Sequence, residues 1–376
     1  RPAEAPAEGA AGGAGAAEGS KKARGGLDPA VVAVLEAKNA ELSRGRKKRA
    51  VPPSLAAPDA VGSYELLSTH ALHKTTAKEG ILSLDVLAGG GDGGDLVLSG
   101  GSDGDAVLFD RGAGKVVQKL SVGGKKAVHC ARFVGPGAVL TAGADKVVSL
   151  WEGEPGSAAR SAQMGGVHAA DVRALSVHPT GSHFATAGSD RLWCLWDLKS
   201  QEPVLKVDGD AAGVADGYTC GVLHPDGLLF GTGTAGSAVH VWDVRTGGVA
   251  VQLEGHEGAA SDVCFSENGY YLASRAKDGA RVWDLRKPPE SRLVRHLEAG
   301  AGSKASAAAF DLSGQYLATG GAGLAVYGVK KEWAALAEVG AVGKKALNAL
   351  KFGPDAKYLL AAMNDHNLRV YGVKEA

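Results

Sequence analysis

Seven times along the chain, a turn rich in Gly and Asp leads into a short apolar segment that ends in an aromatic residue. Those seven endings are Phe109, Trp151, Trp196, Trp242, Trp283, Tyr327 and Tyr371. Successive endings lie 42, 45, 46, 41, 44 and 44 residues apart. A repeat of this length, built from short strands, predicts a β-propeller with one four-stranded blade per unit. Because a blade buries its faces only against its neighbours, we expect an all-β ring of seven blades.

An acid follows most of these aromatics, most clearly in Trp196-Asp197, Trp242-Asp243 and Trp283-Asp284. This recurring Trp-Asp pair resembles WD40 repeats, and the resemblance implies a seven-bladed WD40 propeller. In the third unit, strands are expected over residues 172–177 and 183–187, and a third strand is expected to end at Trp196.

The chain before the ring divides into three segments. Residues 1–26 are rich in Ala and Gly and are interpreted as a flexible linker. Residues 27–50 predict a helix, with Asp28 as N-cap and Pro29 at the first helical position. Residues 51–60 form a connector that contains prolines, and the propeller is assigned to residues 61–376.

The last repeat ends at Tyr371, which leaves no room for a fourth strand in the seventh blade. Residues 64–68, Tyr-Glu-Leu-Leu-Ser, precede the first blade and have no partner of their own. We therefore expect this N-terminal strand to complete the seventh blade and close the ring, since an open edge invites aggregation.

Two blades carry sets of residues that imitate a hydrolase site. The third blade has His168, Thr186, Asp190 and Trp196, and the fifth has His256, Ser274, Asp278 and Trp283. The WD40 resemblance implies a structural role, in which the Asp binds the His, the His binds the hydroxyl, and the hydroxyl accepts the indole N–H. A nucleophile would need an open cleft and an oxyanion site. The sequence shows neither, so we expect no catalytic residue in this chain.

The set is incomplete in the other blades. Blade one keeps Ser99 and Asp103, and blade two keeps Thr141 and Asp145 but has Gly124 at the expected His position. Glycine replaces the expected residue in blade four, at Gly236, and in blade six, at Gly321. We therefore expect blades three and five to be the stiffest.

Composition narrows the functional classes. The 41 basic and 41 acidic residues balance, so no overall field draws the protein to nucleic acid or membrane. No apolar run is long enough for a membrane helix. The four cysteines lack a C-x-x-C neighbour, which argues against zinc, and we predict buried free thiols, no metal and no cofactor.

Charges in the predicted loops suggest a partner surface. The connections between blades and the turns between second and third strands share one face, here called the top face. A basic arc is predicted there from Lys74, Lys78, Lys125, Lys126, Lys344 and Lys345, opposite the acidic residues Asp208, Asp210 and Asp216. The basic arc would suit an acidic protein segment or RNA backbone, and the alternative is a set of solvated lysines.

A second basic group ends the predicted helix: Arg44, Arg46, Lys47, Lys48 and Arg49. Three interpretations stay open: a nuclear-localisation signal, a contact to RNA phosphates, or cations that suit the negative end of the helix dipole.

Several strings go beyond what WD40 repeats share in general. They are residues 34–42, the basic residues 46–49, residues 224–234 (HPDGLLFGTGT), residues 265–273 (FSENGYYLA) and residues 282–287 (VWDLRK). In this order they closely resemble the pre-mRNA-processing factor 19 family, from about Leu27 to the C-terminus. Small residues replace larger ones in loops such as 88–95 and 321–323, so loop contacts made elsewhere in the family are not carried over.

The resemblance implies a nuclear scaffold of the spliceosome-activating nineteen complex, with other proteins of that complex and ubiquitylation substrates as partners and RNA contact at most indirect or weak. It also implies a U-box ubiquitin ligase that forms a homotetramer through a coiled coil. Both of those parts are expected to precede the segment seen here. An unrelated WD40 scaffold without a splicing role is the alternative.

Overall fold

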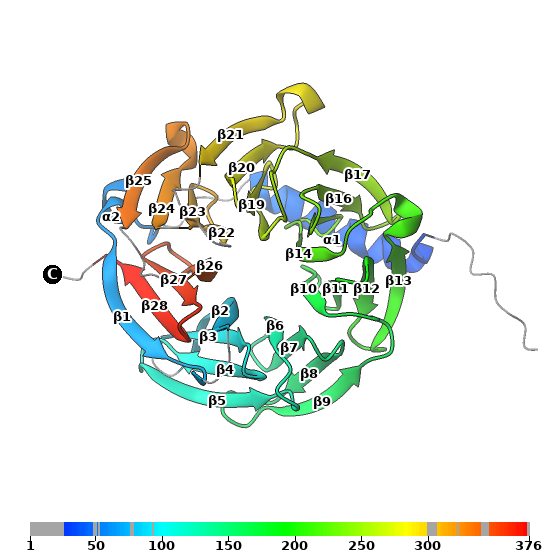
Figure 1. Cartoon of the computed structure of the whole chain (residues 1–376), viewed down its shortest axis with the longest axis horizontal. Coiled ribbons are helices and arrows are strands. Elements are labelled where there is room, and N and C mark those ends of the chain that lie inside the picture. Colours follow the sequence, from blue (N-terminus) through cyan, green and yellow to red (C-terminus); the bar gives the residue numbers. More distant parts are fainter. Residues whose placement is uncertain are drawn as a thin grey trace, which may run out of the picture.

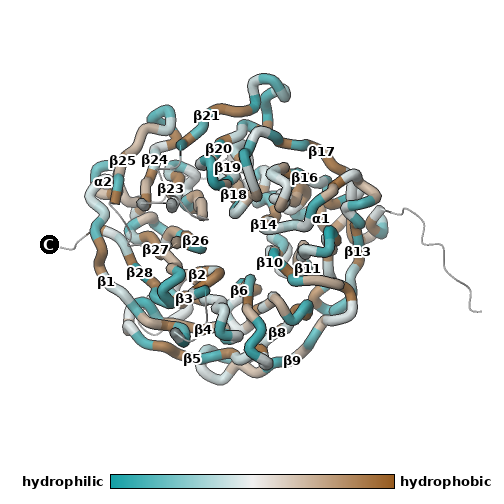
Figure 2. The backbone as a smooth tube through the Cα atoms, viewed as in Figure 1, coloured by the Kyte–Doolittle hydropathy of each residue, from teal (hydrophilic) through white to brown (hydrophobic). Residues whose placement is uncertain are grey.

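The computed structural model describes residues 26–47, 51, 53–75, 79–91, 94–298, 307–321, 323–339 and 346–373. Seven four-stranded antiparallel sheets stand around a central channel, as Figure 1 shows. The seven-bladed propeller predicted from the aromatic period is confirmed. Figure 2 shows hydrophobic and polar positions interspersed along the strands. The middle strands of a blade are buried along their length, as in Asp105–Asp110 and His183–Gly188, because each blade packs against a neighbour on both faces.

The first three blades follow the chain in order from the channel outwards. Their strands are β2 (Ile81–Gly91), β3 (Gly94–Gly101), β4 (Asp105–Asp110) and β5 (Lys115–Ser121); β6 (Val128–Gly135), β7 (Ala138–Gly143), β8 (Val148–Glu152) and β9 (Ala159–Met164); and β10 (Val172–Val177), β11 (His183–Gly188), β12 (Leu192–Asp197) and β13 (Glu202–Asp208).

Blades four to six repeat this order. Their strands are β14 (Tyr218–Leu223), β15 (Leu229–Thr234), β16 (Val239–Asp243) and β17 (Gly248–Leu253); β18 (Asp262–Phe265), β19 (Tyr271–Ala276), β20 (Gly279–Asp284) and β21 (Leu293–Glu298); and β22 (Ala308–Phe310), β23 (Tyr316–Gly320), β24 (Leu324–Gly328) and β25 (Ala334–Val339). Short 3-10 turns cover Asp210–Ala212, Pro289–Ser291 and Val329–Lys331.

Blade seven joins the first strand of the ring to the last three. Its inner strands are β26 (Leu347–Phe352), β27 (Tyr358–Met363) and β28 (Asn367–Gly372), and its outer strand is β1 (Glu65–Ala71). β1 pairs antiparallel with β28, from Glu65 opposite Gly372 to Ala71 opposite Asn367. The predicted closure by an N-terminal strand is confirmed, although the strand begins one residue later and runs further than predicted.

Among the residues that the structure describes, two helices precede the ring. α1 (Pro29–Lys47) begins at the predicted N-cap, where Asp28 Oδ1 accepts the amide of Ala30 at 2.7 Å. A short helix that the sequence pattern did not predict, α2 (Pro58–Gly62), lies against blade six and buries Val61. The carbonyl of Ala56 accepts the hydroxyl of Tyr316 at 2.7 Å, which fixes this segment to the ring.

α1 packs on the bottom face, the face opposite the top face. Leu27 and Leu35 are buried in one cluster with residues of blades three and four. Glu36 forms an ion pair of 3.0 Å with Arg245, which follows β16. Figure 1 shows the helix behind the ring on that side. The helix is therefore part of the folded body.

Polar side chains also join neighbouring blades. His178 Nε2 bonds to the carbonyl of Gly227 at 3.1 Å, which links blades three and four. His224 makes the same contact to Gly269 at 3.0 Å and links blades four and five. The ring of His178 is almost fully buried, and burial lowers its pKa to about 4.

This burial predicts a pH dependence of stability. A histidine whose pKa is about 4 when folded and 6.5 when unfolded takes up protons in the unfolded state first. The free energy of unfolding should therefore fall as pH drops from 6.5 to 4, by about 3 kcal/mol at most from this residue. In His178→Gln, urea unfolding at a series of pH values should show a smaller fall. An equal fall in both proteins would contradict the role of His178.

Candidate functional site

The two sets of residues that imitate a hydrolase site come together in the structure. In blade three, His168 lies 3.2 Å from Asp190 through Nδ1 and 2.9 Å from Thr186 Oγ1 through Nε2. Trp196 Nε1 donates to the same hydroxyl at 2.8 Å. We call each such group a histidine tetrad. Gly188 makes room for it, since a Cβ there would lie 2.8 Å from His168 Nδ1.

The tetrad of blade five is tighter. His256 lies 2.8 Å from Asp278 and 2.7 Å from Ser274, and Trp283 Nε1 donates to Ser274 at 2.8 Å. Arg281 also donates to Asp278, through Nε at 3.2 Å and Nη2 at 3.1 Å. Burial lowers the pKa of His256, so the imidazole is neutral at pH 7 and can donate through Nδ1 while accepting at Nε2.

Neither tetrad is arranged to act on a substrate. Thr186 and Ser274 are fully buried, and each hydroxyl already accepts an indole N–H and lies beside a histidine nitrogen. A nucleophile must reach the reacting atom from an open cleft. The tetrads therefore satisfy buried polar groups and hold the turn between the second and third strands against the sheet.

Blade one contains a histidine that the sequence reasoning missed. His73 Nδ1 lies 2.8 Å from Asp103, and Nε2 lies 2.9 Å from Ser99. This histidine precedes its hydroxyl partner by 26 residues, against 18 in blades three and five. A search that allowed a longer segment between the histidine and the hydroxyl residue would have found His73 in the connection before blade one. Blade one therefore shares the His, Asp and hydroxyl contacts of blades three and five, but Phe109 stands where they have Trp, so it lacks the indole donor.

The remaining blades keep only part of the network. Trp151 donates to Thr141 in blade two, and Trp242 donates to Thr232 in blade four, both at 2.9 Å. Asp145 accepts the amide of Val147, and the structure places no histidine in bonding range of its carboxylate among the described residues.

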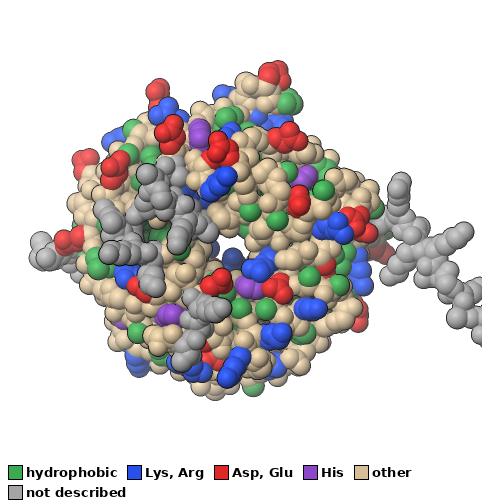
Figure 3. Space-filling model, in the orientation of Figure 1, with side chains coloured by type: hydrophobic (Ala, Val, Ile, Leu, Met, Phe, Trp, Pro, Cys, Tyr) green, Lys and Arg blue, Asp and Glu red, His purple; other side chains and the backbone are tan. Residues whose placement is uncertain are grey.

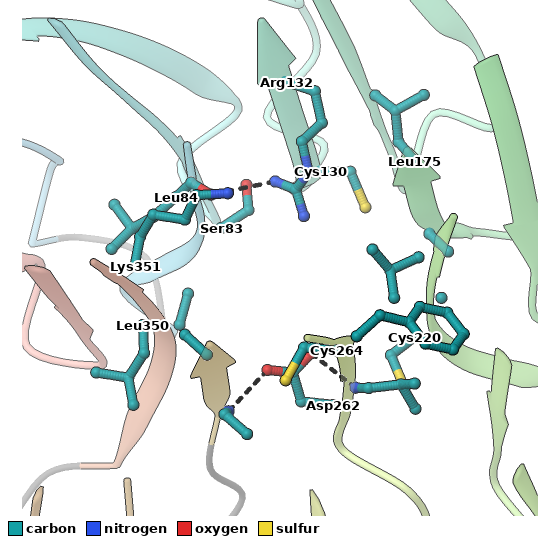
Figure 4. A pocket seen from close by; sticks show the side chains of 18 of the residues that line it. Ser83, Leu84, Cys130, Arg132, Leu175, Cys220, Asp262, Cys264, Leu350 and Lys351 are labelled. Atoms are coloured by element: carbon teal, nitrogen blue, oxygen red, sulfur yellow. Dashed lines mark hydrogen bonds between the residues drawn. The ribbon is translucent and has the colours of Figure 1, made fainter. Parts of the chain in front are cut away.

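The central channel is an internal space of about 500 Å³. In Figure 4, Arg132, Lys351 and Asp262 point into it, and three of the free cysteines line its wall: Cys130, Cys220 and Cys264. Lys351 pairs with Asp85 at 3.2 Å, and Arg132 donates to the carbonyl of Leu84 at 3.3 Å. Within the described residues, no group of three or more His, Cys, Asp or Glu is arranged to hold a metal ion.

The predicted basic arc is described only in part. Lys125 and Lys126 are exposed, with no carboxylate within 4 Å among the described side chains, whereas Lys74 pairs with Asp105 at 3.2 Å. Figure 3 shows basic side chains over the lower part of the top face. The other three lysines of the arc, Lys78, Lys344 and Lys345, lie outside the described residues.

The acidic residues opposite the basic arc are partly neutralised, because Arg191 pairs with Asp210 at 2.8 Å.

The basic residues at the end of the predicted helix are described only in part. Arg44 Nε donates to the carbonyl of Ala40 at 3.1 Å near the end of α1. The side chains of Arg46 and Lys47 are not described, and Lys48 and Arg49 lie outside the described residues. No helix in the described part is long and apolar enough to cross a membrane.

The amino-acid sequence is similar to a family model and to several curated proteins. The family model for the WD domain, G-beta repeat, matches residues 165–197 and 248–284. Pre-mRNA-processing factor 19 of Oryza sativa subsp. japonica and its homolog 2 of Arabidopsis thaliana are each 39% identical over 94% of the chain. The Caenorhabditis elegans pre-mRNA-processing factor 19 is 30% identical over 92% of the chain. The chain spans 66% of the rice and Arabidopsis proteins and 68% of the C. elegans protein.

Proposed function

The chain belongs to the pre-mRNA-processing factor 19 family, and from this membership we propose that it is the partner-recognition propeller of a spliceosomal scaffold, the nineteen complex. The observation that carries the proposal is the 39% identity that extends over 94% of the chain to proteins of that name. The fold suits the role, because a closed ring is a rigid support for loops that contact partners.

The proposal assigns recognition to the top face. There the exposed Lys125 and Lys126 present positive charge that no described carboxylate within 4 Å offsets. An acidic segment of a partner protein would be attracted to them in a salt-dependent way. Beside them in blade one, the contacts of His73 with Asp103 and Ser99 hold the turn between the second and third strands in one conformation, which lowers the entropic cost of binding.

Ubiquitin transfer and cellular location are proposed here for the full-length protein. We propose that the full-length protein is a nuclear U-box ubiquitin ligase, and that the propeller contributes substrate recognition. The purified chain should therefore fail to discharge ubiquitin from a loaded conjugating enzyme.

A direct experiment tests the scaffold role. A tagged copy of the chain, purified from plant nuclei, should carry spliceosomal proteins, and mass spectrometry would identify them. Reversing two charges, in K125E/K126E, should reduce their yield at low salt and leave the melting temperature unchanged. The variant K115E/K119E, which reverses two lysines of β5, is the matched control. Recovery without spliceosomal proteins would refute the proposal.

A further inference from the structure

The bottom face of blade five carries an exposed aromatic ring beside several cations. Tyr270, in the turn between β18 and β19, is 45% exposed. The guanidinium of Arg286, in the turn after β20, lies 4.2 Å from the centre of that ring and 5.7 Å from the ring of Tyr271. Lys287 and Arg292 follow in the same turn. We call Tyr270, Arg286, Lys287 and Arg292 the aromatic–cation platform.

The planar pair at its centre is held in place before any ligand binds. Asp284 accepts Arg286 Nε at 2.8 Å and Nη2 at 2.6 Å, and the carboxylate itself is buried. The hydrogen bond from Arg286 keeps the pKa of Asp284 below its usual range, so this grip persists at neutral pH. A ligand that stacks here would not need to order the guanidinium first.

The charges around the ring are not all balanced. Asp284 offsets Arg286, but neither Lys287 nor Arg292 has a carboxylate within 4 Å in the described part of the chain. Arg292 Nε donates to the carbonyl of Lys287 at 3.1 Å, which keeps the two cations in one loop. Glu290, exposed in the same turn, is the opposing acid. The platform therefore has two available cations beside a stacked ring.

Packing does not account for these residues. Leu272 and Trp283, on the adjoining strands, fill the core of the blade and are buried. Tyr270 and Lys287 instead face solvent, although both lie in strings that set the chain apart from WD40 repeats in general. Their side chains are free for a ligand.

We propose that the aromatic–cation platform binds single-stranded RNA. A base would stack on the Tyr270–Arg286 pair, and Lys287 and Arg292 would contact the flanking phosphates. Aromatic rings and guanidinium planes both accept unpaired bases, and nearby cations follow the backbone. This goes beyond the proposed recognition of proteins by the top face, because it concerns a different ligand on the opposite face.

Fluorescence anisotropy of the whole chain with a labelled oligouridylate of about 12 nucleotides tests the proposal. Tyr270→Ala should weaken binding about tenfold, and Tyr270→Phe should retain it, because the ring and not the hydroxyl stacks. In K287A/R292A, the slope of log affinity against log salt should fall by about 1.4, as expected for two lost phosphate contacts on a single strand.

A matched control lies on the top face of the same blade. Lys277, in the turn between β19 and β20, is exposed, and K277A should bind the oligouridylate like the parent chain. Failure of the parent chain to bind at low salt would overturn the proposal, as would equal losses in K277A and K287A/R292A. If Tyr270→Ala instead weakens binding of a spliceosomal protein and not of RNA, the platform is a protein site and the proposal is wrong.

Discussion

A chain that begins at Leu72, and so lacks β1, is expected to lose its cooperative unfolding transition and to aggregate. β1 supplies the outer strand of blade seven and pairs along the length of β28. Without it, the backbone groups of β28 form an open edge that can pair with another molecule. A ring of blades buries its faces only while every blade is complete, so damage to blade seven reaches both neighbours.

The expected loss of unfolding free energy follows from the side chains that the deleted segment buries. Val61 is fully inaccessible, and Tyr64 is nearly so and donates through its hydroxyl to the carbonyl of Ala356. Each such side chain contributes about 2 kcal/mol by burial. With the pairing of β1 added, the loss approaches the total stability of a typical domain, which is about 5–15 kcal/mol. Scanning calorimetry should then show no sharp transition.

A second truncation separates ring closure from helix packing. A chain that begins at Pro53 lacks α1 but keeps α2, β1 and the buried residues of blade seven. It should melt cooperatively at a lower temperature than the parent, because the burial of Leu27 and Leu35 is lost. If the chain from Leu72 melts like the chain from Pro53, closure by β1 does not stabilise the ring.

The blade count and the closing strand could be predicted because they follow from regular features. Trp196, Trp242 and Trp283 recur where each third strand ends, and all three are buried in the structure. The need for a fourth strand in blade seven follows from the position of Tyr371, which leaves too few residues after it for another strand. α2 could not be predicted, because a helix of five residues has too short an apolar pattern and is stabilised by its contact with blade six.

The site was harder to predict because it depends on contacts between distant segments. His73 escaped notice because the segment between it and Ser99 is longer than the segment between the histidine and the hydroxyl residue in the two tetrads. The platform is built from two turns, and the sequence gives no sign that Arg286 stacks on Tyr270. The ion pair between α1 and the ring joins Glu36 to Arg245, more than 200 residues further along the chain. Such contacts follow from the fold and not from local spacing.

The replacement Asp278→Ala is expected to lower the free energy of unfolding by about 3 kcal/mol. Asp278 is almost fully buried and accepts hydrogen bonds from both His256 and Arg281. Removal of the carboxylate leaves the Nδ1–H of the buried imidazole and the Nε and Nη2 donors of Arg281 without this acceptor. An unsatisfied buried donor costs about 1–3 kcal/mol, and more when it is charged. Urea unfolding at pH 7 measures the difference.

Asp145→Ala in blade two is the matched control, because this Asp occupies the same turn position without a histidine in its network. Its cost should stay at about 1 kcal/mol or less. The pH dependence gives a further check. Burial is the largest single effect and by itself raises the pKa of Asp278, but the hydrogen bonds and charge interactions around the carboxylate, led by those with His256, together outweigh it, and the pKa is lowered on balance.

A carboxyl group with a lowered pKa contributes stability above its unfolded pKa of about 4 and loses that contribution as pH falls through the folded value. The gap in unfolding free energy between the parent chain and Asp278→Ala should therefore be widest near neutral pH and should close below pH of about 4. A gap that persists unchanged at low pH would mean that Asp278 acts through its shape. Equal losses in Asp278→Ala and Asp145→Ala would show that the histidine adds nothing, and the tetrad of blade five would then not be a stabilising unit.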